Sequence, residues 1–141
     1  MKAKKSLGQN FLKSEIALRK IVEAGEINSD DIILEIGPGK GALTSKLLET
    51  ACKVLAIEKD EELYEFLKIK FEKEISSGQL NLIQGDILEF SISNFQVSKY
   101  KIIANIPYNI TGAILKKFLT EKNQPESMVL MIQHEVATRI L

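Results

Sequence analysis

The sequence contains almost none of the residues from which metal centres and disulfide frameworks are built. Its 141 residues include one cysteine, Cys52, one histidine, His134, and no tryptophan. A single cysteine excludes an internal disulfide. Because the chain has only one histidine in addition, there is no ligand cluster for a structural metal. A Ser/His/Asp set and a phosphate-binding loop with its lysine are also missing, so the reaction classes that need them have no support.

Long apolar runs are missing as well. No stretch approaches the ~20 apolar residues that cross a membrane, and the N-terminus has no apolar signal-peptide core. Hydrophobic residues make up 45% of the chain and charged residues 27%, an ordinary balance for a globular domain with its own core. We therefore expect a single domain, located in the cytoplasm.

The chain has no net charge, because 19 basic residues balance 19 acidic ones, and this argues against a uniformly basic nucleic-acid binder. The distribution is uneven, however. The first twenty residues form a basic arm that either lies on a phosphate backbone or is a solvated terminus. In this arm only Glu15 opposes six basic residues: Lys2, Lys4, Lys5, Lys13, Arg19 and Lys20.

What the sequence does have is a glycine turn between a predicted strand and a predicted helix. The apolar run 32–36 is typical of a buried strand, and residues 42–48 have the pattern of a helix. Between them Gly37, Gly39 and Gly41 stand at alternate positions, so that a ligand can lie against bare backbone N–H groups. The spacing differs from the Gly-x-Gly-x-x-Gly of dinucleotide-binding proteins.

An acidic residue, Glu58, closes the second apolar run, 54–57. It stands about 20 positions after the glycines, the distance at which a carboxylate binds the two ribose hydroxyls of a nucleotide in related folds. Taken alone, Glu58 is equally well explained as a solvated carboxylate at a strand end. The glycine turn ahead of it favours nucleoside binding.

Five strands alternate with helices along the chain, which predicts a parallel sheet covered by helices on both faces. Helices are expected over 14–24, 60–73 and 111–120 and from Glu135 onward. Ser14 caps the first and Gly25 ends it in a left-handed conformation. The helical faces are expected to bury Ile16, Ile21 and Val22 in the first helix and Leu63, Phe66, Leu67 and Phe71 in the second. The strands are expected over 32–36, 54–58, 80–83, 101–104 and 128–132 in the order 3-2-1-4-5.

Polar or glycine-rich segments follow four of these strands: 35–41, Glu58, 85–86 and 105–108. Ligands of parallel sheets bind outside the carboxyl ends of the strands, so these segments are expected to meet in one crevice. Asp86 is placed to accept a hydrogen bond from the exocyclic amine of adenine, although an Asx turn or a helix cap explains it equally well.

The segment Asn105-Ile106-Pro107-Tyr108 offers two acceptors, the Asn105 side-chain oxygen and the Ile106 carbonyl, for a planar amine. Pro107 keeps Ile106 extended, and Tyr108 offers a ring on which a flipped-out base stacks. A proline turn with a buried tyrosine is the alternative. Methyl transfer from a sulfonium suits these groups, because the protein mainly has to position the nucleophile in line with the methyl group.

The chain resembles the family of small-subunit rRNA adenine N6,N6-dimethyltransferases over nearly its whole length and in family order. That resemblance implies a Rossmann-like, class I S-adenosylmethionine-dependent methyltransferase fold. The matching motifs are Lys5-Ser6-Leu7-Gly8-Gln9-Asn10-Phe11-Leu12, Glu35-Ile36-Gly37-Pro38-Gly39-Lys40-Gly41, Glu58, Gly85-Asp86, Asn105-Ile106-Pro107-Tyr108-Asn109 and Gln133-His134-Glu135-Val136-Ala137.

The resemblance also implies roles for individual residues. S-adenosylmethionine is expected to contact Asn10, Leu12, Gly37, Glu58, Asp86 and Asn105, and the catalytic pocket for the target adenine is expected to comprise Asn105, Pro107 and Tyr108. Residues 1–13 form an arm whose Gln9-Asn10-Phe11-Leu12 closes over the cofactor. The substrate is a pair of adjacent adenines in a hairpin near the 3′ end of small-subunit rRNA, within a pre-30S-type particle.

Family members continue into two more strands and a helical C-terminal domain, whereas this chain stops at Leu141. We therefore expect residues 1–141 to be an incomplete S-adenosylmethionine-binding domain, truncated after the fifth strand. Such a domain binds the cofactor but turns over poorly, because a later aromatic clamp and much of the RNA-binding surface are missing. The full-length protein is expected to be a monomer. The fragment is expected to self-associate through the apolar edge of its fifth strand.

Three alternatives remain open. The macrolide-resistance methyltransferases, which act on large-subunit rRNA, share Gln9-Asn10-Phe11 and the Asn105–Tyr108 segment, while Leu7, Gly8 and Pro38 favour the small-subunit family. A non-catalytic ribosome-assembly factor with this fold is disfavoured by the intact Asn105–Tyr108 segment. A nicotinamide-dependent oxidoreductase is disfavoured by the glycine spacing.

Overall fold

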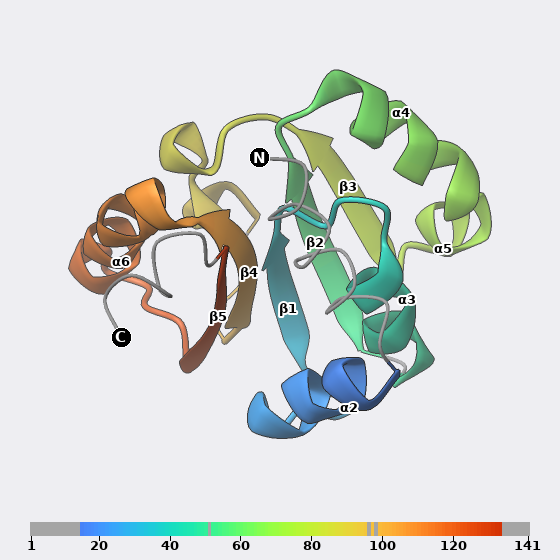
Figure 1. Cartoon of the computed structure of the whole chain (residues 1–141), viewed down its shortest axis with the longest axis horizontal. Helices are drawn as coiled ribbons and strands as arrows, with labels where there is room; N and C mark the ends of the chain where they lie inside the picture. Colours follow the sequence, from blue (N-terminus) through green and yellow to red (C-terminus); the bar gives the residue numbers. More distant parts are fainter. Residues whose placement is uncertain (1–14, 51, 96, 98, 134–141) are drawn as a thin grey trace.

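A computed structural model describes residues 15–50, 52–95, 97 and 99–133 (Figure 1). At its centre is a five-stranded sheet in the order β3-β2-β1-β4-β5, and all its neighbouring strands are parallel. The predicted strand order and parallel arrangement are thus confirmed. The strands are β1 (Ile32–Ile36), β2 (Lys53–Glu58), β3 (Leu80–Gln84), β4 (Lys101–Pro107) and β5 (Ser127–Gln133).

Side chains alternate across β1, so that each face of the sheet has its own core. Ile33 belongs to the cluster that contains Leu43, Leu47 and Leu67, whereas Leu34 belongs to the one that contains Ile114 and Phe118. Both faces of the central strand are buried, and this is why its sequence is apolar at nearly every position.

The helices divide between these two faces (Figure 1). The first face is covered by α2 (Glu15–Ala24), α3 (Ala42–Glu49) and α4 (Glu61–Lys70), and α5 (Glu72–Ser77) continues from α4. The second face is covered by α6 (Thr111–Thr120), which has the predicted bounds. Three short 3-10 turns lie in the connections: η1 (Ile87–Glu89), η2 (Ile92–Phe95) and η3 (Tyr108–Ile110).

Two details of the first predicted helix are wrong. Gly25 does not end α2 in the left-handed region; Glu26 adopts that conformation, with φ 49, while the N–H of Gly25 still donates to the carbonyl of Ile21. Ile16 is 68% exposed, and Leu18 takes its place in the core beside Ile21. The expected cap, Ser14, and the helix from Glu135 lie outside the described residues.

The helix predicted over 60–73 is interrupted at Phe71, where φ is −109, so α4 ends at Lys70. Phe66 is 45% exposed, whereas Leu67 and Phe71 are buried. The fourth strand is longer than expected and runs through Pro107, which places the Asn105–Pro107 segment inside the sheet, paired with β5.

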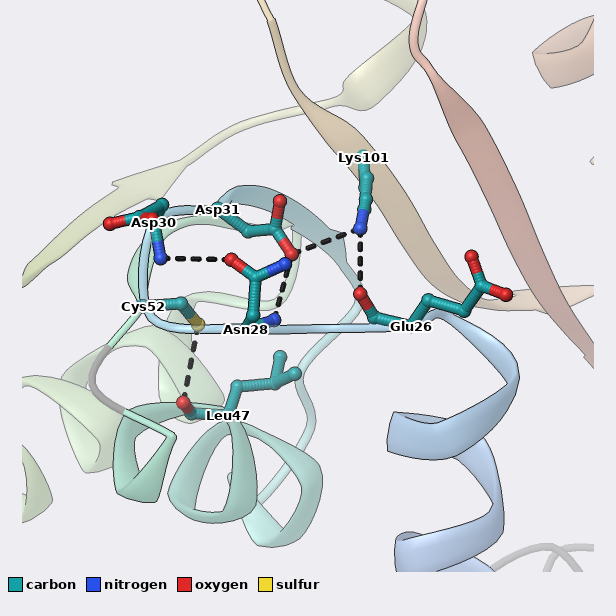
Figure 2. A network of polar contacts seen from close by, with 7 residues as sticks. All are labelled: Glu26, Asn28, Asp30, Asp31, Leu47, Cys52 and Lys101. Carbon is teal, nitrogen blue, oxygen red and sulfur yellow. Dashed lines mark hydrogen bonds and ion pairs between the residues drawn. The ribbon is translucent and has the colours of Figure 1, made fainter.

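A polar network closes the amino-terminal end of the sheet (Figure 2). Lys101 Nζ at the start of β4 lies 3.0 Å from Asp31 Oδ2 and donates to the carbonyl of Glu26 at 2.8 Å. Asp31 Oδ2 also accepts from the N–H of Asn28. The side chains of Lys101 and Asp31 are only 14% and 12% exposed. The network therefore fastens the loop after α2 to a strand 70 positions later in the chain.

Cys52 lies beside this network, where the carbonyl of Leu47 accepts from its thiol (Figure 2). Burial raises the pKa of the Cys52 thiol, so it stays protonated and packs as a small apolar group. In the part of the chain that the structure describes, no helix is both long enough and apolar enough to cross a membrane.

Candidate active site

A pocket opens at the carboxyl ends of β1, β2 and β4, where the polar strand ends were predicted to meet. It lies at the point where the strand order reverses between β1 and β4, the usual ligand position in such sheets. The residues that line it are Ile36, Gly37, Gly39, Ile57, Glu58, Lys59, Leu63, Gly85, Ile87, Asn105, Ile106, Pro107 and Ile110.

The glycine turn brings bare backbone to this pocket. Gly37, Gly39 and Gly41 all have positive φ, at 70, 62 and 87. A Cβ on Gly37 would lie 2.6 Å from the backbone oxygen of Asn105, so glycine is required for the turn to approach β4 this closely. A Cβ on Gly39 would meet no atom within 4 Å, because this residue borders open space.

Glu58 at the end of β2 is held by two backbone N–H groups. Its Oε1 accepts from Gly39 at 3.1 Å and its Oε2 from Asp60 at 2.9 Å. The residue is only 6% exposed, which excludes the alternative of a solvated carboxylate. A carboxylate has about four lone-pair sites, so two remain for the hydroxyls of a ribose. The free acceptor sites of Glu58 thus fit the nucleoside predicted from the sequence.

Asp86 is not among the residues that line this pocket, although its two neighbours in the chain, Gly85 and Ile87, are. Its Oδ1 accepts from the N–H of Leu88 at 2.9 Å and caps η1, the alternative that the sequence left open. Its Oδ2 lies 3.6 Å from Lys59 Nζ, and the side chain is 33% exposed. A ligand amine that binds Oδ2 would share this oxygen with the Lys59 ammonium, and the adenine-binding role of Asp86 stays a prediction.

The predicted base-binding segment lines the other side of the pocket. Asn105 is half-buried and Pro107 exposed, and both belong to the last part of β4. Tyr108 begins the turn η3, whose last residue, Ile110, also lines the pocket. Two predicted cofactor ligands, Asn10 and Leu12, lie outside the described residues.

One feature of the site was missed from the sequence. Leu63 was expected only in the apolar face of its helix, but it also lines the pocket. Together with Ile36, Ile57 and Ile87 it forms an apolar wall suited to the flat face of a base. The only signal was that Leu63 is the first apolar residue after Glu58.

Glu35 was expected in the crevice as part of the segment 35–41, but it is not among the residues that line the pocket, and it is only 2% exposed. Its Oε1 accepts from the Thr44 hydroxyl of α3 at 2.6 Å. Burial raises the pKa of Glu35 to about 7, and the nearby charge of Glu58 adds to this rise while the Thr44 hydrogen bond opposes it. The burial of Glu35 and its raised pKa were not predicted. The signal available in the sequence was a charged residue inside an otherwise apolar strand.

Comparison with known proteins agrees with this geometry. A family model described as ribosomal RNA adenine dimethylase matches residues 1–141. The chain belongs to this family. It is 45% identical to ribosomal RNA small subunit methyltransferase A of Dehalococcoides mccartyi (strain CBDB1), over 100% of this chain and 48% of that protein. With the protein of the same name from Mycoplasma capricolum the identity is 44%, over 99% of this chain and 53% of the relative.

Two solved structures share the fold. A dimethyladenosine transferase from Plasmodium falciparum superposes with a TM-score of 0.70 at 34% identity, covering 90% of this chain and 44% of that one. The 23S rRNA methyltransferase ErmE superposes with a TM-score of 0.71 at 28% identity, covering 83% and 46%. The class I S-adenosylmethionine-dependent methyltransferase fold is thus confirmed. The chain spans about half the length of the curated relatives it matches.

Proposed function

We propose that this chain is the S-adenosylmethionine-binding domain of an rRNA adenine N6,N6-dimethyltransferase that modifies two adjacent adenines near the 3′ end of small-subunit rRNA. The observation that carries the proposal is the meeting of the glycine turn, Glu58 and Asn105 in one pocket of a chain that belongs to the adenine dimethylase family. The relatives named for the small ribosomal subunit support the choice of substrate.

S-adenosylmethionine, the cofactor in this proposal, supplies a methyl group already activated by the positive charge on its sulfur. Glu58 holds the ribose through the lone pairs that Gly39 and Asp60 leave free. Asp86 accepts from the adenine amine through Oδ2, and Leu63 and Ile57 pack against the base. The glycine turn lies close to the ligand because Gly37 carries no side chain.

Asn105 is the catalytic residue of the proposed mechanism. Its side-chain oxygen and the Ile106 carbonyl accept from the two hydrogens of the target amine, which holds the nitrogen lone pair toward the methyl group. Pro107 and Tyr108 border the target base. With the cofactor bound, these acceptors would hold the amine nitrogen in line with the methyl group, S-adenosylhomocysteine would be the leaving group, and the methylated amine would release its proton to water. The loss of that proton follows the transfer, so no general base is needed.

The test compares ribosomal subunits as substrates. The full-length natural protein is incubated with labelled S-adenosylmethionine and with small or large subunits from cells that lack the corresponding modification. We expect label in two adjacent adenines of the small-subunit rRNA. Label in the large subunit would support the macrolide-resistance alternative, and no label in either would support a non-catalytic assembly factor.

The large-subunit alternative has one observation in its favour. ErmE, named for 23S rRNA, superposes as well as the dimethyladenosine transferase does. The shared fold therefore does not distinguish the two substrates. The higher sequence identity to the small-subunit relatives favours the small subunit, where a pre-30S-type particle in the cytoplasm is the partner in our proposal.

A second part of the proposal concerns self-association through the outer edge of β5. Among the described strands β5 pairs only with β4, and its residues Met128 to Leu130 are half-buried and apolar. An apolar edge with unpaired N–H and C=O groups is a template for pairing with another chain. We expect the 141-residue chain to self-associate through this edge, and the full-length protein to be a monomer. Sedimentation at tens of micromolar tests both; a monomeric 141-residue chain would contradict the proposal.

A further inference from the structure

Helix α4 and the residues at its two ends contact the proposed cofactor pocket or the glycine turn at three places. At its start, the N–H of Asp60 donates to Glu58 Oε2 while the Asp60 side chain caps the helix by accepting from Leu63. One turn further on, Leu63 lines the pocket. Beyond the other end of the helix, Phe71 packs against the glycine turn.

The contact with the glycine turn is close and has two parts. Lys70 Nζ donates to the backbone carbonyl of Lys40 at 2.8 Å. Gly41 lies so near the Phe71 ring that a Cβ there would be 2.6 Å from Cε2. Phe71 is 5% exposed, and Lys70 Nζ also lies 5.3 Å from the centre of its ring. The ammonium group therefore joins the turn and the aromatic side chain.

The same contact explains why the helix stops where it does. Phe71 leaves helical geometry, with φ −109, at the residue whose ring fills the space beside Gly41. Glu58 is thus connected to the glycine turn in two ways, directly and through α4. Gly39 donates to Glu58, Glu58 accepts from Asp60, and α4 leads back to Gly41 through Phe71.

We propose that α4 is a brace for the cofactor pocket, in which Lys70 and Phe71 are positioning residues that fix the glycine turn at the distance from Glu58 that the ligand requires. Neither residue lines the pocket, and both act through the backbone of residues 40 and 41. This inference rests on the proposed cofactor site. It adds residues outside that site which set the binding affinity.

The variant Lys70→Met removes the hydrogen bond to the turn and keeps the length of the side chain. Lys68→Met is the matched control, because Lys68 lies on the same helix and pairs with Glu65 and the Tyr64 ring instead. Calorimetry with S-adenosylhomocysteine is expected to show about three- to tenfold weaker binding for Lys70→Met. The control should match the wild type, and Lys70→Arg should restore most of the affinity.

Two further measurements separate positioning from general stability. Amide hydrogen exchange of Gly39 and Gly41 without ligand should be faster in Lys70→Met than in Lys68→Met, at equal melting temperatures. Phe71→Leu should show the same effects more strongly. In the full-length protein, Lys70→Met should raise KM for S-adenosylmethionine and leave kcat nearly unchanged.

The brace is overturned if Lys70→Met binds S-adenosylhomocysteine as tightly as Lys68→Met and its turn exchanges no faster. Failure of the wild-type chain to bind S-adenosylhomocysteine would instead contradict the proposed cofactor site. The exchange comparison needs no ligand and would still decide the brace. If Phe71→Leu does not fold, Lys70→Met alone tests the brace. Lys70 lies at the surface, so its substitution is expected to leave the fold intact.

Discussion

The two ends of the sheet carry similar polar groups but use them differently. At the amino-terminal end, Asp31 accepts from both Lys101 and the N–H of Asn28, and Lys101 also donates to the carbonyl of Glu26 (Figure 2). At the carboxyl-terminal end, Glu58 accepts from two backbone N–H groups and still faces a pocket. The first carboxylate is neutralised by a cation of the chain itself, whereas the second is oriented by backbone donors.

This difference indicates which end is built for stability and which for binding. A buried carboxylate with a paired cation holds two segments together and leaves little for a ligand to gain. A carboxylate oriented by N–H groups keeps its charge and its spare lone pairs for a ligand. Substitutions in the network of Asp31 and Lys101 should therefore change stability alone, and those of pocket-lining residues should change binding or rate.

The largest effect is expected for Asn105→Ala in the full-length protein. Methyl transfer should slow by about a hundred- to a thousandfold or more, because the target amine loses an acceptor that positions it. Cofactor affinity should fall much less. Single-turnover assays on unmodified small subunits measure the rate of methyl transfer. Asn81→Ala, at an exposed position of β3, is the control. A variant with near-normal turnover would remove Asn105 from the mechanism.

The second effect concerns Glu35→Gln and its dependence on pH. In the unfolded chain the carboxyl ionises near its ordinary value of 4.5, whereas its folded pKa is about 7. Stability should therefore fall as the pH rises from about 4.5 to 7, and the whole deficit, about 3 kcal/mol, should be present above 7. Glutamine does not ionise, so the variant should gain stability over the wild type at pH 8 and not at pH 4.5.

Denaturant unfolding of both proteins at pH 4.5 and pH 8 measures this difference. Glu61→Gln, at an exposed position of α4, is the control and should follow the wild type at both values. Parallel behaviour of Glu35→Gln and the wild type would mean that Glu35 ionises normally in the folded protein.

The third effect is the loss of cofactor affinity in Glu58→Ala. We expect binding of S-adenosylmethionine to weaken by about 1.5–3 kcal/mol, the contribution of a hydrogen bond to a charged group. Glu62→Ala is a suitable control, because that carboxylate is exposed at the start of α4. Calorimetry that finds unchanged affinity in a folded Glu58→Ala protein would refute the ribose assignment.

The smallest effect is expected at the opposite end of the sheet. Lys101→Met leaves the carboxylate of Asp31 without its cation and should lower the free energy of unfolding by about 1–2 kcal/mol. S-adenosylhomocysteine should bind with wild-type affinity, and Lys99→Met, at an exposed position, should change neither quantity. Weaker ligand binding in Lys101→Met would show that the two ends are coupled.

The sequence predicted those features that follow from strand ends and backbone conformation. The strand order is the usual one for this fold, and the meeting of the glycine turn with Glu58 followed from the rule that ligands bind outside the carboxyl ends of parallel strands. The break at Phe71 could not be predicted, because the helical pattern continues there and the neighbour of the Phe71 ring, Gly41, is distant in sequence. Pairs such as Lys101 and Asp31 leave no local signal either.

The position of the pocket between β1 and β4 has a consequence for the order of folding. β1 pairs with β2 and β2 with β3 over short connections, whereas β1 meets β4 only after the chain has closed a loop of about the length that separates Asp31 from Lys101, 70 positions. Long-range pairing of this kind comes late, because the intervening chain must be ordered first. We therefore expect the pocket to form late in folding, and a ligand that binds only the finished pocket to stabilise the folded state.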